Sequence, residues 1–144
     1  MSIKQISVFL ENKPGTLLAM TGALAEHQID MRALSLSETS DFGIARLIVD
    51  DIITASTVLK DAGFIYNVST VLAVCVPDEP GGLNKVLNIL SNAGINVEYM
   101  YAFLGGASTK HAYMIFRVQD TKAAAAALRS KGIQLVDQEE ISQL

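Results

Sequence analysis

Hydrophobic and polar positions in the first half of the chain follow the spacings of strands and helices. Positions 3–10 are rich in Ile, Val and Phe, which is typical of a strand. From Leu17 the apolar positions recur every three or four residues, as on one face of a helix that Thr16 can cap. The predicted elements are strands at 3–10, 29–36, 43–49 and 64–68, a helix from Leu17 and a second helix over 55–62.

The same order of elements returns in the second half. The clearest helical stripe in the chain is formed by Leu83, Val86, Leu87 and Leu90. An alanine-rich run predicts another helix, capped by Asp120 or Thr121. The predicted elements are strands at 69–76, 96–103, 113–118 and 133–136, helices over 83–90 and 121–128, a turn at 105–108 and one helical turn after Asp137.

The two halves align as copies of one sequence unit. An offset of 66 residues relates Pro14 to Pro80, and an offset of 69 relates Val49 to Val118. The three additional residues of the second copy fall in the turn between its second and third strands, where insertions are tolerated. A single change of offset, placed in a loop, indicates an internal duplication.

Each copy has the strand and helix order of the ferredoxin-like βαββαβ fold, an antiparallel sheet with helices on one face. The predicted fold class is therefore α+β, with two such units in tandem at residues 1–68 and 69–144. No polar linker separates the copies around Val68 and Ser69. We therefore expect one extended segment to close the first sheet and open the second.

Composition narrows the classes of function. The chain has 144 residues, of which 50% are hydrophobic, and a net charge of −4, which disfavours binding to nucleic acid. No apolar run approaches the roughly 20 residues that cross a bilayer, and the start lacks a signal-peptide pattern, so we expect a cytoplasmic protein with no membrane partner. Cys75 is the only cysteine, and we interpret it as a core residue. The sequence indicates no metal site and no cofactor.

A repeated loop with Pro and Gly leads from the first strand of each copy into its first helix. It reads Asn12-Lys13-Pro14-Gly15-Thr16-Leu17 in the first copy and Asp78-Glu79-Pro80-Gly81-Gly82-Leu83 in the second. Glycine lets a ligand approach the backbone closely, and the unpaired N–H groups of the following helix attract a carboxylate. Asn12 and Asp78 carry oxygens that can accept from an ammonium group. Carboxylate and ammonium together describe the head of a free α-amino acid.

A second repeated polar position opens the second strand, at the opposite end of its unit from the loop. It is Asp30 in the first copy and Asn96 in the second. A pseudo-twofold pairing of the units would place each of these residues against the loop of the other unit. We therefore predict two composite sites, of which the one with Asp78 and Asp30 is more acidic and should favour cationic groups or hold the α-ammonium more strongly. The predicted ligand-binding residues are Asn12, Lys13, Pro14, Gly15, Thr16, Leu17, Asp30, Met31, Asp78, Glu79, Pro80, Gly81, Gly82, Leu83, Asn96 and Val97.

Taken together, these residues resemble the ACT domain. The resemblance rests on the Asn-x-Pro-Gly-x-Leu run at 12–17, on Gly94-Ile95-Asn96 and on the βαββαβ order, and it covers nearly the whole chain. It implies a tandem ACT-domain protein that senses a small molecule, usually an amino acid, at the interface between paired domains, without catalysis. We expect such a protein to regulate amino-acid metabolism and to bind a free amino acid. Its protein partner would be a second copy of itself, in a homodimer, or a metabolic enzyme.

Three alternatives stay open at this stage. The loops can be plain turns. The chain can be a regulatory subunit of a biosynthetic enzyme, similar to the small subunit of acetolactate synthase, which would need a partner surface. An enzyme is least favoured, because the sequence contains no evident Ser/His/Asp or Cys/His set. Neither His27 nor His111 has a neighbouring carboxylate residue that recurs in both copies.

Overall fold

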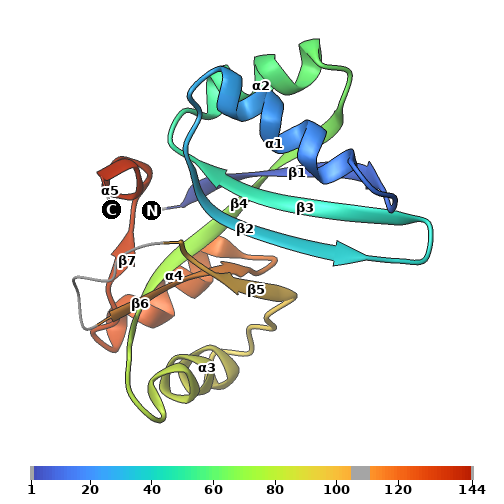
Figure 1. The fold of residues 1–144 in the computed structure, drawn as a ribbon. Helices are drawn as coiled ribbons and strands as arrows, with labels where there is room; N and C mark the ends of the chain where they lie inside the picture. Colours follow the sequence, from blue (N-terminus) through green and yellow to red (C-terminus); the bar gives the residue numbers. More distant parts are fainter. Residues whose placement is uncertain (1, 105–110, 144) are drawn as a thin grey trace. The chain divides into compact units, whose positions relative to one another are not determined.

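The structure, a computed structural model, describes residues 2–104 and 111–143 (Figure 1). The chain divides into two compact units, a first unit that spans Lys4–Ser69 and a second unit that consists chiefly of Thr70–Leu144. No helix in the described residues is long and apolar enough to cross a membrane.

The first unit contains four strands and two helices in the predicted order. Its sheet has the strand order β2-β3-β1-β4, with β3 antiparallel to both β1 and β2. The elements are β1 (Ile3–Glu11), α1 (Thr16–Glu26), β2 (Met31–Glu38), β3 (Phe42–Val49), α2 (Ile52–Asp61) and β4 (Ile65–Pro77), of which β4 continues into the second unit.

The second unit repeats this arrangement with the far half of β4 as its first strand. Antiparallel pairing gives the strand order β7-β4-β6-β5. The further elements are α3 (Gly82–Asn92), β5 (Tyr99–Ala102), β6 (His111–Arg117), α4 (Thr121–Ser130), β7 (Leu135–Val136) and α5 (Gln138–Gln143).

Strand register confirms the duplication independently of the sequence alignment. In the first unit Ile6 lies opposite Leu47, and in the second Leu72 lies opposite Phe116. These pairs are related by the same two offsets, 66 residues before the hairpin and 69 after it. The predicted fold class, two ferredoxin-like βαββαβ units with antiparallel sheets, is therefore confirmed.

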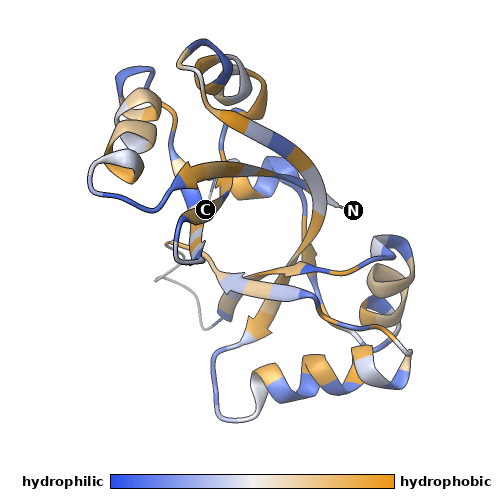
Figure 2. Cartoon of the chain, turned by 90° about the vertical axis from the view of Figure 1, so that its right-hand side faces the viewer, coloured by the Kyte–Doolittle hydropathy of each residue, from blue (hydrophilic) through white to orange (hydrophobic). Residues whose placement is uncertain are grey.

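Each sheet buries one face beneath its two helices. Alternate strand residues supply one side of each core, and the apolar stripes of the helices supply the other. Figure 2 shows many hydrophobic residues along the strands and a mixture of colours along the helices. Burial of one large apolar side chain contributes roughly 1.5–3 kcal/mol. The buried helix residues include Met20, Leu24, Ala55 and Leu59 in the first core and Val86, Leu90, Ala124 and Leu128 in the second.

Strand β4 runs without interruption from Ile65 to Pro77. Its early residue Tyr66 packs against the first core, and its later residues Leu72 and Val74 are buried in the second core. The prediction of one extended segment across the join is therefore confirmed.

Several predicted boundaries in the second unit were wrong. β5 begins at Tyr99 and not at Asn96, because the backbone first bonds β6 through Glu98 N–H and Arg117 O, at 2.9 Å. β7 is limited to two residues, and the tail forms a six-residue helix, longer than the single turn expected. The predicted turn at 105–108 lies outside the described residues.

Helix α3 begins in close contact with the end of its strand. A Cβ atom on Gly82 would lie 2.0 Å from the carbonyl oxygen of Pro77, far inside van der Waals contact. The equivalent residue of α1 is Thr16, whose side chain fits its site. The two repeated loops therefore share a plan but differ in how tightly the helix approaches the strand.

Substitution of Gly82 by alanine should destabilise the protein by about 1–3 kcal/mol, because the backbone must move to admit the new methyl group. Gly22→Ala is the matched control, since its added Cβ meets no atom within 4 Å in α1. It should stabilise the protein by about 0.5–1 kcal/mol. Urea unfolding measures both values, and a Gly82→Ala variant as stable as the wild type would contradict the close contact.

Asp51 caps α2 and makes its contribution to stability dependent on pH. It accepts from the hydroxyl of Thr54 at 2.6 Å and from the N–H of the same residue at 3.1 Å. These bonds, the hydroxyl first, lower the pKa of Asp51. The stabilisation is therefore present above the unfolded-state pKa of about 3.9 and is lost as the pH falls through the folded-state pKa.

Wild-type protein should accordingly lose more stability than Asp51→Asn between about pH 5 and pH 3. Asparagine keeps an acceptor oxygen but does not titrate, so it removes only the pH-dependent part. Thermal unfolding across this range provides the measurement. Parallel curves for the two proteins would show that the carboxylate does not carry the effect.

Candidate functional site

Each repeated loop turns through a glycine in the left-handed region. Gly15 has a φ of 89° and Gly81 a φ of 84°, and these glycines stand at the N-caps of α1 and α3. Residues with a Cβ rarely adopt such angles. Glycine is therefore required at both positions for the chain to pass from strand to helix in a few residues.

The first turns of α1 and α3 present unpaired amide groups. The N–H groups of Leu17 and Leu18, and those of Leu83 and Asn84, make no hydrogen bond to any described residue. They lie at the positive end of the helix dipole, where a carboxylate is stabilised. Both loops can therefore receive an anionic group.

The predicted capping role of Thr16 is wrong. Gly15 occupies the N-cap position, and the Thr16 hydroxyl instead donates back to the carbonyl oxygens of Glu11, at 2.7 Å, and Lys13, at 3.0 Å. The side chain therefore fastens the loop to the end of β1 and leaves the helix amides uncovered. Since Thr16 is the first helical residue, its own side chain cannot act as the cap.

Asn12 ties the first loop to the hairpin between β2 and β3. Its N–H donates to Asp41 O at 2.9 Å, and its side-chain Nδ2 donates to Thr39 O at 3.0 Å. The amide nitrogen is thereby engaged, so the side-chain oxygen is the atom left to accept from a ligand. The residues of the second unit that are equivalent to Thr39 and Asp41 lie outside the described residues.

A small hollow brings four of the predicted residues of the first loop together. It has a volume of about 100 Å³ and is lined by loop residues and by the hairpin strands β2 and β3. The predicted residues that line it are Asn12, Lys13, Thr16 and Leu17. In the second loop Asp78, Glu79, Pro80 and Gly81 are all exposed, whereas Gly82 is buried.

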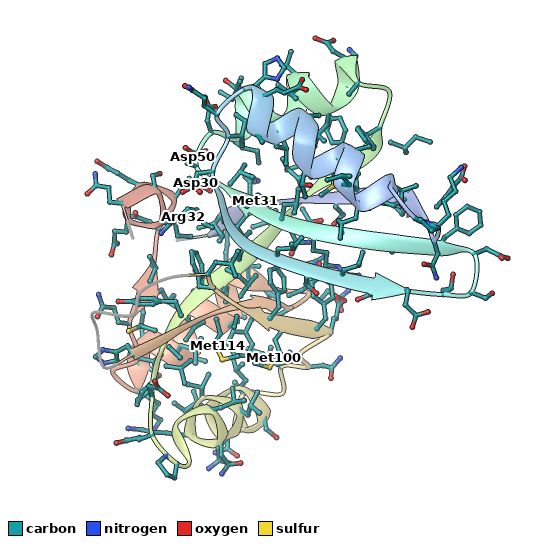
Figure 3. All side chains as sticks on the ribbon, viewed as in Figure 1. Asp30, Met31, Arg32, Asp50, Met100 and Met114 are labelled. Atoms are coloured by element: carbon teal, nitrogen blue, oxygen red, sulfur yellow. The ribbon has the colours of Figure 1, made fainter. Side chains whose placement is uncertain are left out.

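Asp30 lies at the opposite end of the first unit from the loop, as predicted, next to the end of β3 (Figure 3). Its N–H donates to Asp50 Oδ1 at 3.0 Å, and its carbonyl oxygen accepts from Asp50 N–H at 3.1 Å. The Arg32 guanidinium donates to its carboxylate at 2.9 Å, and the Arg32 side chain is only 14% exposed. The carboxylate of Asp30 is therefore already balanced by a cation of its own unit.

Sequence reasoning missed Arg32. The available signal was the spacing of two residues, which places Asp30 and Arg32 on the same side of an extended chain. Because this ion pair offsets one negative charge, the expected cation preference of a site with Asp78 and Asp30 rests mainly on Asp78.

The end of the second unit that contains Asn96 borders a pocket. A pocket of about 240 Å³ is lined there by polar residues that include Asn96, Glu98, Gln119 and Asp120. The duplication makes Asn96 and Gln119 equivalent to Asp30 and Asp50. In the first unit this position is thus hydrogen-bonded to Asp50 and Arg32, whereas in the second unit it borders a pocket.

Four predicted residues are largely committed to packing. Met31 and Leu17 are partly buried against the first core, and Val97 and Leu83 against the second. Most of each of these side chains is therefore unable to contact a ligand, and the backbone groups are the parts suited to binding one.

Cys75 is buried, in agreement with the prediction of a core residue. Burial raises the pKa of its thiol, although a hydrogen bond from Tyr113 acts in the opposite direction. A thiol kept protonated in this way is a poor nucleophile. In the described part of the chain no group of three or more His, Cys, Asp and Glu side chains is placed to hold a metal ion.

Comparison with solved structures gives strong and weak matches. Protein BT0572 from Bacteroides thetaiotaomicron is 38% identical, with a TM-score of 0.93, over 100% of this chain and 98% of that chain. The ligand-free regulatory subunit of aspartate kinase from Thermus thermophilus is 18% identical, with a TM-score of 0.63, over 88% of each chain. The small subunit of acetolactate synthase from Thermotoga maritima is 12% identical over 93% of this chain and 90% of that chain, and its TM-score of 0.39 is too low to carry an argument.

No curated protein matches the chain. Among protein families, the ACT domain pair matches residues 1–144, which is the whole chain. The match agrees with the two glycine loops, the paired registers and the antiparallel sheets described above. The protein therefore belongs to the ACT domain pair family.

Proposed function

We propose that this protein is a non-catalytic sensor that binds a free amino acid at its Pro–Gly loops and thereby regulates amino-acid metabolism. The observation that carries the proposal is the repetition of one chemical arrangement. In both loops a left-handed glycine leads into a helix whose first amides are unpaired, and a side-chain oxygen of Asn12 or Asp78 lies two residues before the proline. The α-carboxylate would bind the amides, and the α-ammonium would bind the side-chain oxygen.

The family and its relatives support a regulatory role. The chain is an ACT domain pair over its whole length, and a protein of the same fold is the regulatory subunit of aspartate kinase in Thermus thermophilus. That likeness, at 18% identity, supports the fold and does not identify the amino acid. The pairing of each loop with Asn96 or Asp30 of the other unit stays a prediction from the sequence.

The two loops should differ in affinity. Asn12 offers a neutral oxygen beside Lys13, whereas Asp78 offers a carboxylate beside Glu79. A charged acceptor forms a hydrogen bond to an ammonium roughly twice as strong as a neutral one. The second loop should therefore hold the α-ammonium more tightly, while the first should depend more on the rest of the ligand.

Association with a metabolic enzyme is the second candidate, and exposed apolar side chains on the helices favour it. Leu18 of α1 is 74% exposed and Ile53 of α2 is 80% exposed. This function would be supported if a catalytic chain co-purifies with the protein and if the activity of that chain changes when the protein is added. It would be compatible with amino-acid binding, since a regulatory subunit can carry the ligand.

Amino-acid binding is tested by thermal unfolding and titration calorimetry with a panel of free amino acids. A ligand at one hundred times its Kd should stabilise the protein by about 2.7 kcal/mol. Asn12→Ala should weaken one binding event and Asp78→Ala another. Asn67→Ala and Glu139→Ala are the controls, because they likewise remove an exposed amide and an exposed carboxylate but lie outside the loops. They should leave both binding events unchanged.

Two results would contradict amino-acid binding at the loops. If no amino acid shifts the unfolding temperature or produces heat, the loops are turns without a ligand. If binding occurs but neither Asn12→Ala nor Asp78→Ala affects it, the amino acid binds elsewhere.

A further inference from the structure

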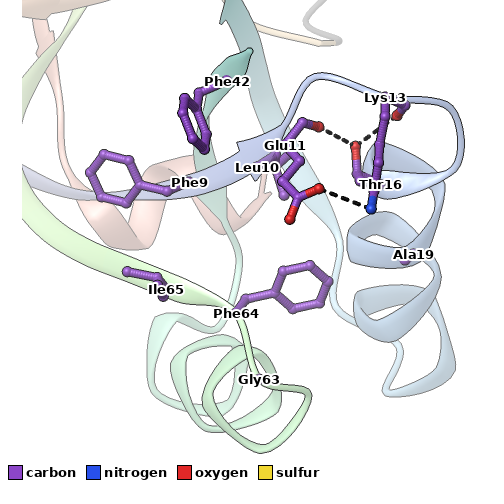
Figure 4. Close-up of a pocket in the computed structure, with 10 residues that line it drawn as sticks. All are labelled: Phe9, Leu10, Glu11, Lys13, Thr16, Ala19, Phe42, Gly63, Phe64 and Ile65. Atoms are coloured by element: carbon purple, nitrogen blue, oxygen red, sulfur yellow. Dashed lines mark hydrogen bonds and ion pairs between the residues drawn. The ribbon is translucent and has the colours of Figure 1, made fainter.

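The first unit contains a pocket of about 410 Å³ beside its Pro–Gly loop (Figure 4). It lies where β1 ends and β4 begins, and α1 borders it through Thr16 and Ala19. Its volume falls within the roughly 300–1,000 Å³ that is usual for small-molecule sites. The residues that determine its character are Phe9, Phe42, Phe64, Ile65, Glu11 and Lys13.

The walls of the pocket are apolar and exposed. Phe9 is 44% exposed, Phe42 is 62% exposed and Ile65 is 71% exposed. Phe64 is partly covered by its packing against the first core. Large apolar side chains that remain exposed around one concave site commonly mark a binding surface.

A charged pair lies at the rim of this pocket. Lys13 Nζ and Glu11 Oε2 are 2.9 Å apart, and each side chain is 62% exposed. An ion pair this exposed contributes little to folding, so its two charges can be exchanged for those of a ligand at small cost. One cation and one anion side by side match the carboxylate and the ammonium of a zwitterion.

The second unit provides an internal comparison that isolates the pocket. Glu11 lies opposite Phe42 in the first sheet, and Pro77 lies opposite His111 in the second, which fixes the equivalence of the two sites. All the phenyl rings and both rim charges of the first site are replaced. The residues equivalent to Phe9, Phe42, Phe64, Ile65, Glu11 and Lys13 are Cys75, His111, Ile133, Gln134, Pro77 and Glu79.

We propose that the first unit selects amino acids with a large hydrophobic side chain, which this pocket receives while Asn12 and the helix amides of the loop bind the zwitterionic head beside the Lys13–Glu11 pair. The inference rests on the proposed function, since it names the class of amino acid for the first of the two loops. The second loop, where no phenyl ring occupies an equivalent position, has no such preference. The protein therefore distinguishes its two sites by the side chain that each accepts.

A homologous series of ligands provides the first test. Alanine, 2-aminobutyrate, norvaline and norleucine, all in the L form, share one head and differ by single methylene groups. Each methylene buried in the pocket should strengthen binding by about fourfold. Titration calorimetry on the full chain measures this, and an affinity that does not rise along the series would overturn the inference.

Substitutions toward the second unit provide the second test. Phe42→His and Ile65→Gln introduce the residues of the equivalent positions and should each weaken norleucine binding by about tenfold while leaving alanine binding nearly unchanged. Ile53→Gln is the matched control, because it removes from α2 an isoleucine that is 80% exposed, compared with 71% for Ile65, and that lies outside the pocket. It should alter neither affinity.

The outcomes separate the inference from the function on which it rests. If no amino acid binds, the proposed function fails and the inference with it. If amino acids bind but Phe42→His and Ile65→Gln leave norleucine affinity unchanged, the sensor role stands and the pocket does not select. The pocket is likewise excluded as the selective element if Ile53→Gln weakens norleucine binding as much as the two pocket variants do.

Discussion

The left-handed glycine at the end of each unit's central strand is the constraint on which both halves of the molecule depend. Gly15 and Gly81 let the chain turn from strand to helix within a few residues, so the helix returns across the sheet that it covers. The same turn leaves the first amides of the helix without partners among the described residues. Packing of the core and capacity for an anion therefore come from one backbone conformation.

Once the backbone is duplicated, the two copies are free to differ in side chains. The first loop is fastened by the Thr16 hydroxyl and bordered by aromatic rings, whereas the second is closed tightly against Pro77 because Gly82 has no side chain. At the other end, Asp30 is bonded to its own unit and Asn96 borders a pocket. The two copies therefore share one fold and differ in the side chains at both ends of the unit.

The sequence was sufficient to predict the fold, because the signals for it are local and occur twice. Pro and Gly after a strand, an aspartate cap before a helix and a regular apolar spacing each predict their element without knowledge of the rest. The late start of β5 was not predictable in this way. Residues 95–98 are suited to a strand by composition, and only their position beside β6 decides where the ladder begins.

The candidate site was predicted only in part, because its remaining components come together through strand register. Phe9, Phe42 and Ile65 are far apart in the chain and each is an ordinary apolar residue in an apolar strand. Their convergence depends on which strands pair and on which face each side chain lies. Arg32 was missed for a different reason, since the two-residue spacing that places it beside Asp30 was available in the sequence and was not used.

Strand β4 has a consequence for how this gene can change. Even-numbered residues, Tyr66 on one side of the join and Leu72 and Val74 on the other, supply both cores. Insertion or deletion of one residue between them would turn odd-numbered side chains, Asn67 in the first unit or Ala73 and Cys75 in the second, toward a core that is packed by the even-numbered ones. The connection between the second and third strands is three residues longer in the second copy than in the first. β4, in contrast, should change by substitution alone, because both units depend on the same alternation of its side chains.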